Sequence, residues 1–144
     1  MSPEKKFTEE QKAAMVAAIQ QAEKATSGEI RVHIENHCRK NVLDRAADVF
    51  AQLKMHKTAA RNGVLVYVAL EDRKLAILGD AGINAKVPAN FWEGIKIRMV
   101  EQFKQGLITE GIREAVLSAG NALKTYFPYQ TDDKNELPDD ISFN

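Results

Sequence analysis

Apolar and polar residues alternate along the chain with two different periods, which separates the expected strands from the expected helices. Residues 29–35 switch between aliphatic and polar side chains at every second position, which predicts a strand with one buried face. Residues 63–70 are continuously apolar and rich in β-branched side chains, as in a central strand buried on both faces. Residues 74–79 follow a tight polar turn and are expected to form its hairpin partner.

Four other segments repeat apolar residues at helical spacing. They cover about residues 8–27, 41–55, 91–105 and 109–126. Thr8 and Gln11 fit a capping box at the start of the first helix, and Gly28 is expected to end that helix in the left-handed conformation that glycine tolerates. Gly106 separates the third helix from the fourth.

The order of these elements, α-β-α-β-β-α-α, predicts an α/β fold: a three-layer α/β/α sandwich with a short mixed sheet. The arrangement is Rossmann-like, but the glycines of residues 79–82 lack the spacing of a dinucleotide motif. A right-handed crossover makes the first two strands parallel, and the hairpin makes the third antiparallel to the second. The starts of the first two strands and the end of the third are therefore expected to share one edge.

We expect residues 1–128 to form the α/β domain and residues 129–144 to form an acidic C-terminal tail. From position 130 onward the tail has five acidic residues and one lysine. It also contains three apolar residues that could dock on the domain: Leu137, Ile141 and Phe143.

The composition excludes several classes of protein. With 44% hydrophobic and 28% charged residues, the chain has the composition of a globular domain. Its 20 basic and 20 acidic residues balance, so no global field favours nucleic acid or a membrane surface. The polar start does not resemble a signal peptide, and no apolar run is long enough to span a membrane. We expect a cytoplasmic monomer.

Glu29, Asn62 and Asp80 are all expected at the shared edge of the sheet. Carboxylate, amide and backbone carbonyl oxygens are the ligands that calcium and magnesium prefer, and Gly82 lets the backbone near Asp80 bend and present carbonyls. The sequence therefore predicts a site for Ca²⁺ or Mg²⁺ formed by Glu29, Asn62, Asp80 and Gly82. The alternative is that the glycines and Asp80 are ordinary turn residues.

A short basic segment leads to the same edge. It contains Lys54, His56, Lys57 and Arg61. These side chains could attract a phosphate beside a bound cation, which would suit a phosphatase. The alternative is a solvated loop with no role in binding.

Other residues capable of chemistry have simpler explanations. The three histidines lack the spacing of a zinc site. Cys38, the one cysteine, is expected to be a surface thiol, because no positioned base accompanies it. Glu71 and Asp72 are expected to be solvated turn residues. Asp44 and Asp48 should face solvent from their helix.

Four short motifs make the chain resemble the TPM domain family, named for a thylakoid-lumen protein, a photosystem II repair protein and a receptor-accessory protein. The similarity covers about residues 7–128, and the order and spacing of the motifs carry it. The motifs are Ser27-Gly28-Glu29-Ile30-Arg31-Val32, Asn62-Gly63-Val64-Leu65, Asp72-Arg73-Lys74 and Gly79-Asp80-Ala81-Gly82-Ile83. The chain differs from many relatives at Asp80, where they carry an aromatic residue.

The resemblance implies an α/β/α sandwich, an acidic surface groove that binds a divalent cation, typically calcium, and the weak acid-phosphatase activity attributed to plant relatives. Two classes of function follow. A binding module would hold the cation and recognise a protein partner at the groove. A metal-dependent phosphatase would use the cation to polarise a small phosphate ester and activate water. No nucleophile is obvious in the sequence, which favours the binding module.

Overall fold

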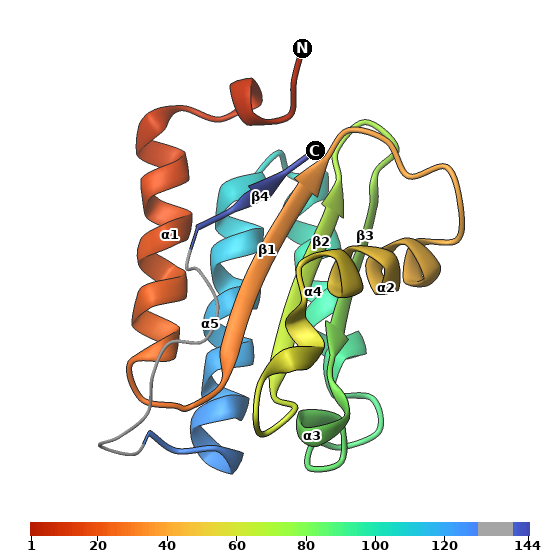
Figure 1. Cartoon of the computed structure of the whole chain (residues 1–144). Coiled ribbons are helices and arrows are strands. Elements are labelled where there is room, and N and C mark those ends of the chain that lie inside the picture. Colours follow the sequence, from red (N-terminus) through yellow and green to blue (C-terminus); the bar gives the residue numbers. More distant parts are fainter. Residues whose placement is uncertain (130–139) are drawn as a thin grey trace.

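The computed structural model describes residues 1–129 and 140–144 (Figure 1). Each predicted helix and strand between residues 8 and 126 is present, and four short elements add to them: η1, η2, α3 and β4, where η marks a 3-10 helix. In chain order the elements are η1 (Glu4–Lys6), α1 (Glu9–Glu23), β1 (Glu29–Glu35), α2 (Val42–Gln52), η2 (Met55–Lys57), β2 (Gly63–Ala69), β3 (Lys74–Gly79), α3 (Ala81–Asn84), α4 (Phe91–Lys104), α5 (Ile108–Tyr126) and β4 (Ser142–Phe143).

The sheet has the strand order β3-β2-β1-β4. Strand β1 runs parallel to β2 and to β4, and β3 runs antiparallel to β2. The mixed sheet predicted from the crossover and the hairpin is therefore confirmed. The starts of β1 and β2 and the end of β3 meet at the bottom of Figure 1; we call this the amino-end edge.

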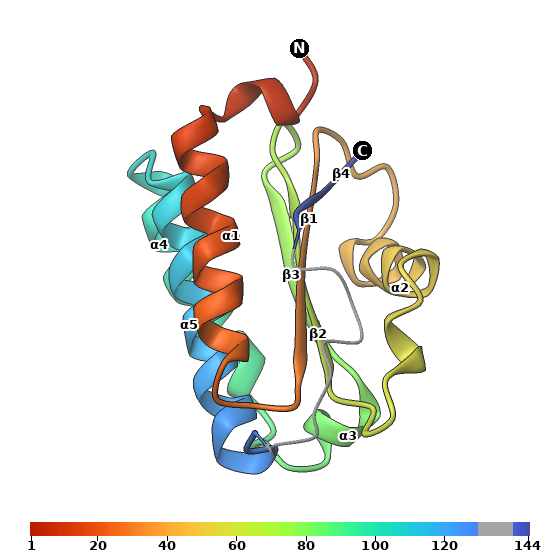
Figure 2. The same ribbon diagram turned by 60° about the vertical axis from the view of Figure 1, so that its left-hand side comes forward.

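The sheet lies between two helical layers, as predicted. Helices α1, α4 and α5 cover one face, and α2 covers the other (Figure 2). Ile30, Val32 and Ile34 of β1 belong to the core on the first face, whereas Leu65 and Tyr67 of β2 belong to the smaller core beneath α2. No helix in the described ranges has the length and apolar character needed to cross a membrane.

Helix α1 begins as predicted but does not end as predicted. Thr8 accepts from the Gln11 amide and the Gln11 side chain accepts from the Thr8 amide, which completes the capping box. The helix ends at Glu23, and Gly28 does not have a positive φ. A Cβ at Gly28 would lie 2.6 Å from Cδ2 of Leu123. Gly28 thus leaves room for the buried Leu123 side chain of α5. The predicted left-handed cap is wrong, because the φ of Gly28 is not positive.

Strand β1 differs from the prediction of a single buried face. All seven of its residues are buried. Its polar side is formed by Glu29, Arg31, His33 and Glu35, which are 2%, 8%, 4% and 3% exposed. Alternation correctly groups the side chains by face, but β1 is an inner strand whose second face is covered as well. The polar residues of β1 therefore lie in a buried layer, in which His33 contacts Glu35.

The end of the chain pairs with the sheet as strand β4. Ser142 and Phe143 align with His33 and Ile34 of β1. Ile141 is 7% exposed and belongs to the core beneath α1 and α5. These contacts confirm that Ile141 and Phe143 dock on the domain. Leu137 and the tail's acidic residues other than Asp140 lie outside the described residues.

Candidate functional site

The fold brings three of the residues predicted as ligands together at the amino-end edge. Glu29 aligns with Gly63, the first residue of β2, and its backbone N–H donates to the carbonyl of Asn62 at 3.4 Å. The backbone N–H of Asp80 donates to the Gly63 carbonyl at 2.9 Å. Glu29, Asn62 and Asp80 are 2%, 1% and 7% exposed. The expected convergence of the three turns is thus observed in the backbone.

Asp80 is held by an arginine and by a helix end. Its Oδ2 accepts from Nε of Arg61 at 2.8 Å, and its Oδ1 accepts from Nη2 of Arg61 at 2.9 Å. Oδ1 also accepts from the Ala81 amide at 2.7 Å, which caps α3. Burial alone would raise the pKa of Asp80, but the hydrogen bonds from Arg61 and Ala81 lower it below the usual value. Asp80 is therefore ionised and bound at both oxygens.

Asn62 contacts Glu29 through its backbone carbonyl and precedes Gly63, whose carbonyl accepts from Asp80. Its Nδ2 is 3.5 Å from Oγ of Ser27, and its backbone N–H donates to Oγ1 of Thr58 at 3.2 Å. Its Oδ1 is buried and has no hydrogen-bond partner within the described residues. A buried amide oxygen without a partner is costly, so Oδ1 of Asn62 is a candidate ligand atom.

Gly82 contributes close packing to this edge. Its backbone N–H donates to the Arg61 carbonyl at 2.8 Å. A Cβ at Gly82 would lie 2.1 Å from the carbonyl oxygen of Ala60, so only glycine fits. Because its φ is not positive, the freedom to adopt unusual backbone angles is not what the position requires. Gly82 instead lets α3 touch the connector before β2.

Carboxylates alone do not make a metal centre at this edge. In residues 1–129 and 140–144, no three histidine, cysteine, aspartate or glutamate side chains are grouped so that they could hold an ion. A cation held by Glu29 and Asp80 would also need the Asn62 oxygen, backbone carbonyls or water, which is the mixed shell that calcium accepts.

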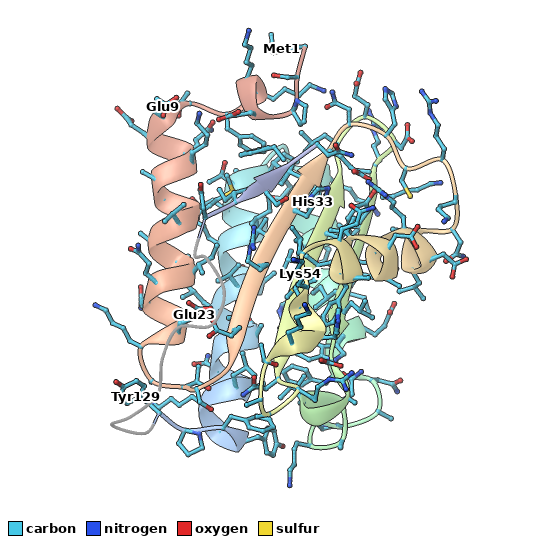
Figure 3. All side chains as sticks on the ribbon, in the orientation of Figure 1. Met1, Glu9, Glu23, His33, Lys54 and Tyr129 are labelled. Carbon is cyan, nitrogen blue, oxygen red and sulfur yellow. The ribbon has the colours of Figure 1, made fainter. Side chains whose placement is uncertain are left out.

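A second polar cluster, which the sequence analysis does not predict, is centred on Glu35 at the other end of β1. Arg45 of α2 donates to both carboxylate oxygens, from Nε at 2.8 Å and from Nη2 at 2.8 Å. The Tyr67 hydroxyl donates to Oε2, and the Asn144 side chain donates to Oε1 at 3.1 Å. His33, labelled on β1 in Figure 3, lies between this cluster and β4. Its Nε2 is 3.1 Å from Glu35 Oε1, and its Nδ1 is 2.8 Å from Ser142 Oγ.

The charges of this cluster are strongly perturbed. Burial opposes ionisation of Glu35, yet hydrogen bonds from Arg45 and Tyr67 lower its pKa far below the usual value. Burial and the hydrogen bond to Glu35 raise the pKa of Tyr67, which stays protonated. Burial lowers the pKa of His33, against the opposing effect of Glu35. The native cluster therefore contains an ionised Glu35 and a neutral His33.

Sequence signals for this cluster exist but are indirect. Tyr67 interrupts an aliphatic run in the central strand, and a buried tyrosine hydroxyl needs a hydrogen-bond partner. In parallel strands paired from residues 29 and 63, His33 stands opposite Tyr67. If the polar face of β1 is assumed to be buried, Glu35 stands two residues beyond His33 on that face. Its carboxylate is then near enough to accept from the Tyr67 hydroxyl.

Two predictions are wrong in the region of Cys38, one about Cys38 itself and one about Asp72. Cys38 is buried rather than a surface thiol, and its Sγ donates to the Lys40 carbonyl at 3.2 Å. Asp72 is more than a solvated turn residue: its Oδ2 accepts from the Cys38 amide at 2.7 Å, and its Oδ1 is 3.1 Å from Nδ1 of His37. Asp72 thus connects the β2–β3 turn to the loop after β1.

Comparisons with known proteins give the family. The family model of the TPM domain matches residues 2–122. The chain belongs to the TPM domain family. This result confirms the resemblance carried by the four motifs.

Two solved structures share the fold of this TPM domain. The BA42 protein from the psychrophilic bacterium Bizionia argentinensis superposes with a TM-score of 0.88 at 49% identity, over 94% of each chain. The N-terminal domain of a P. gingivalis protein has a TM-score of 0.67 at 20% identity, over 84% of this chain and 78% of the other. The second likeness shows the fold alone. A comparison with curated protein sequences gave no significant match.

Proposed function

We propose that this TPM domain is a binding module that holds one divalent cation, Ca²⁺ or Mg²⁺, at the amino-end edge and recognises a protein partner there. Glu29 and Asp80 would supply carboxylate oxygens, Asn62 an amide oxygen, and the turn at Gly82 backbone carbonyls. The buried Oδ1 of Asn62, which accepts no hydrogen bond from the described residues, is the observation that supports the proposal most directly. A bound cation would satisfy this atom.

Arg61 and a cation would compete for Asp80. The guanidinium now binds both carboxylate oxygens, but its side chain is 53% exposed. Because the Arg61 side chain is largely exposed, it could turn into solvent when a cation takes its place beside the buried carboxylate of Asp80. Oδ2 of Asp80 would then be available to the cation while Oδ1 still accepts from the Ala81 amide, and the carboxylates of Glu29 and Asp80 would balance the double charge of the ion.

Amide NMR during a calcium titration tests the proposal. We expect saturable shifts at residues 29, 62 and 80 of the wild-type protein. Asp80→Asn should weaken calcium binding by about tenfold or more, a loss of at least about 1.4 kcal/mol, because it removes a charged ligand. Arg61→Gln should strengthen binding severalfold, because it removes the competing guanidinium.

Asp44→Asn is the matched control, because Asp44 is exposed on α2 and loses the same charge. It should bind calcium like the wild type. The proposal fails if the calcium shifts avoid the amino-end edge, or if Asp80→Asn and Asp44→Asn bind equally well.

A second candidate function is a metal-dependent phosphatase acting on small phosphate esters. The specific feature that favours it is the exposed basic connector: Arg61 and His56 are exposed beside Asp80, and the exposed Lys57 follows His56 in the chain. Once displaced by a cation, Arg61 could hold a phosphate next to the metal, which would polarise the ester. Calcium-dependent hydrolysis of para-nitrophenyl phosphate that Asp80→Asn abolishes would favour the enzyme. Calcium binding without hydrolysis would favour the binding module.

A further inference from the structure

A hollow lies on the surface at the far end of the sheet from the amino-end edge. It forms where the β2–β3 turn meets the end of α4 and the turn into α5, near the top of Figure 1. Its volume is about 580 Å³, within the range of about 300–1,000 Å³ that small-molecule sites span. Residues that line it include Leu70, Arg73, Leu75, Val100, Phe103 and Lys104. We call it the β2–α4 hollow.

The floor of the β2–α4 hollow is apolar and firmly supported. Leu75 is 6% exposed, and with Val100 and Phe103 it belongs to or packs on the main core. A Cβ at Gly111 would lie 2.7 Å from Cε1 of Phe103, so the phenyl ring rests directly on the backbone of α5. The floor is therefore formed before any ligand binds, which lowers the entropic cost of binding.

The charged residues that line the hollow are all basic. They are Arg73, Lys74 and Lys104, and none of the described acidic residues lines it. The ammonium of Lys74 is occupied, because it donates to the Cys38 carbonyl at 3.2 Å. Arg73 and Lys104 are exposed, and neither forms an ion pair with another described residue. The positively charged side chains of Arg73 and Lys104 thus stand beside an apolar floor and can bind a ligand.

This combination selects one kind of ligand. An apolar body gains from leaving water against the floor, and an anionic head gains from charge-assisted hydrogen bonds to arginine and lysine. A neutral or cationic amphiphile would lack the second interaction.

We propose that the β2–α4 hollow binds a small amphiphilic carboxylate. Its aliphatic body lies on Leu75 and Phe103, and its carboxylate is held by Arg73 and Lys104. This site is separate from the amino-end edge and needs no metal ion, so it stands or falls independently of the proposed cation site.

Amide NMR with sodium octanoate, below its micelle-forming concentration, tests this site on the full chain. We expect saturable shifts at Leu70, Val100 and Phe103. The neutral analogue 1-octanol and the cationic analogue octylammonium should bind at least about threefold more weakly. Added salt should weaken octanoate binding and leave octanol binding unchanged, because salt screens exposed charges.

Two variants separate charge from general hydrophobic adsorption. Lys104→Gln should weaken octanoate binding about threefold to tenfold without changing octanol binding. Lys96→Gln is the control, because it removes the same charge from α4 at a position outside the lining, and it should bind like the wild type. Circular dichroism checks that each variant is folded.

The inference is overturned if octanoate produces no saturable shifts at the hollow. It is also overturned if octanol or octylammonium binds as well as octanoate, or if Lys104→Gln and Lys96→Gln have equal affinities.

Discussion

Single residues of the Glu35 cluster show how a charge can be buried in this domain. Glu35 is 3% exposed and receives hydrogen bonds from Arg45, Tyr67 and Asn144. A buried carboxylate is tolerated when its charge is paired and its oxygens are satisfied, whereas the loss of one partner is strongly felt. Each donor to Glu35 should therefore contribute to the stability of the fold.

Tyr67→Phe is expected to destabilise the protein by about 1.5–3 kcal/mol, the range for a hydrogen bond to a charged group. The phenyl ring keeps the packing, so the change isolates the hydroxyl. Urea unfolding followed by circular dichroism measures it. Tyr126→Phe is the matched control, because Tyr126 is 38% exposed, and it should change stability by less than about 0.5 kcal/mol. Equal stabilities of the two variants would contradict a role for the Tyr67–Glu35 bond.

The residues predicted from sequence are those governed by strand direction and local motifs. Thr8 and Gln11 are found by the capping box, and Glu29 and Asp80 converge because the strand order requires it. Glu35 and Cys38 are missed because their burial depends on how α2 and the β2–β3 turn pack on the sheet, which the residue pattern of β1 alone does not reveal. The Arg61–Asp80 pair is missed because helix and strand patterns carry no information on side-chain partners across a loop.

At the scale of elements, the packing of α1 on α5 depends on a residue without a side chain. A Cβ at Gly120 would lie 2.6 Å from Cβ of Ala22, so the two helices meet backbone to backbone at this point. By contrast, a Cβ at Gly94 of α4 would meet nothing within 4 Å. The two helical glycines therefore form a natural pair for comparison.

Gly120→Ala should destabilise the protein by about 1–3 kcal/mol, because overpacking would push α1 away from α5. Gly94→Ala should instead stabilise it by about 0.4–1 kcal/mol, because alanine restricts the unfolded chain and favours the helix. Thermal unfolding of both variants measures the effect. A stabilised Gly120→Ala would contradict the close approach of α1 and α5.

Element prediction succeeds for long periodic segments and fails for short ones. The main helices and the first three strands follow from their apolar spacing. Helix α3, with four residues, exists because Asp80 caps it and Gly82 fits against Ala60. Strand β4, with two residues, exists because β1 offers an edge. Neither length contains enough positions for a period to be detected.

At the scale of the whole molecule, the buried histidine of β1 links stability to pH. Burial lowers the pKa of His33 below its usual value of 6.5, despite the nearby Glu35, while Arg31 and Arg45 add to the lowering. The unfolded chain therefore binds a proton near pH 6.5 that the folded chain resists. Stability is fully present above this pH and falls as the pH drops below it.

We expect the free energy of unfolding of the wild type to decrease between pH 7 and about pH 5. His33→Gln should flatten this decrease, because glutamine does not titrate. Urea unfolding at a series of pH values measures the slopes. His56→Gln, at an exposed position, should keep the wild-type slope. If His33→Gln keeps it too, His33 is not the group responsible.

Strand β4 also has a consequence for how the domain is made. Ser142 joins His33 across 109 positions of the chain, and pairings so distant in sequence form slowly because a long loop must close first. During synthesis, the edge of β1 that pairs with β4 stays unpaired until residues 142–143 have left the ribosome. An unpaired strand edge is a template for pairing with other chains. The newly synthesised domain is therefore most prone to self-association before β4 pairs with β1.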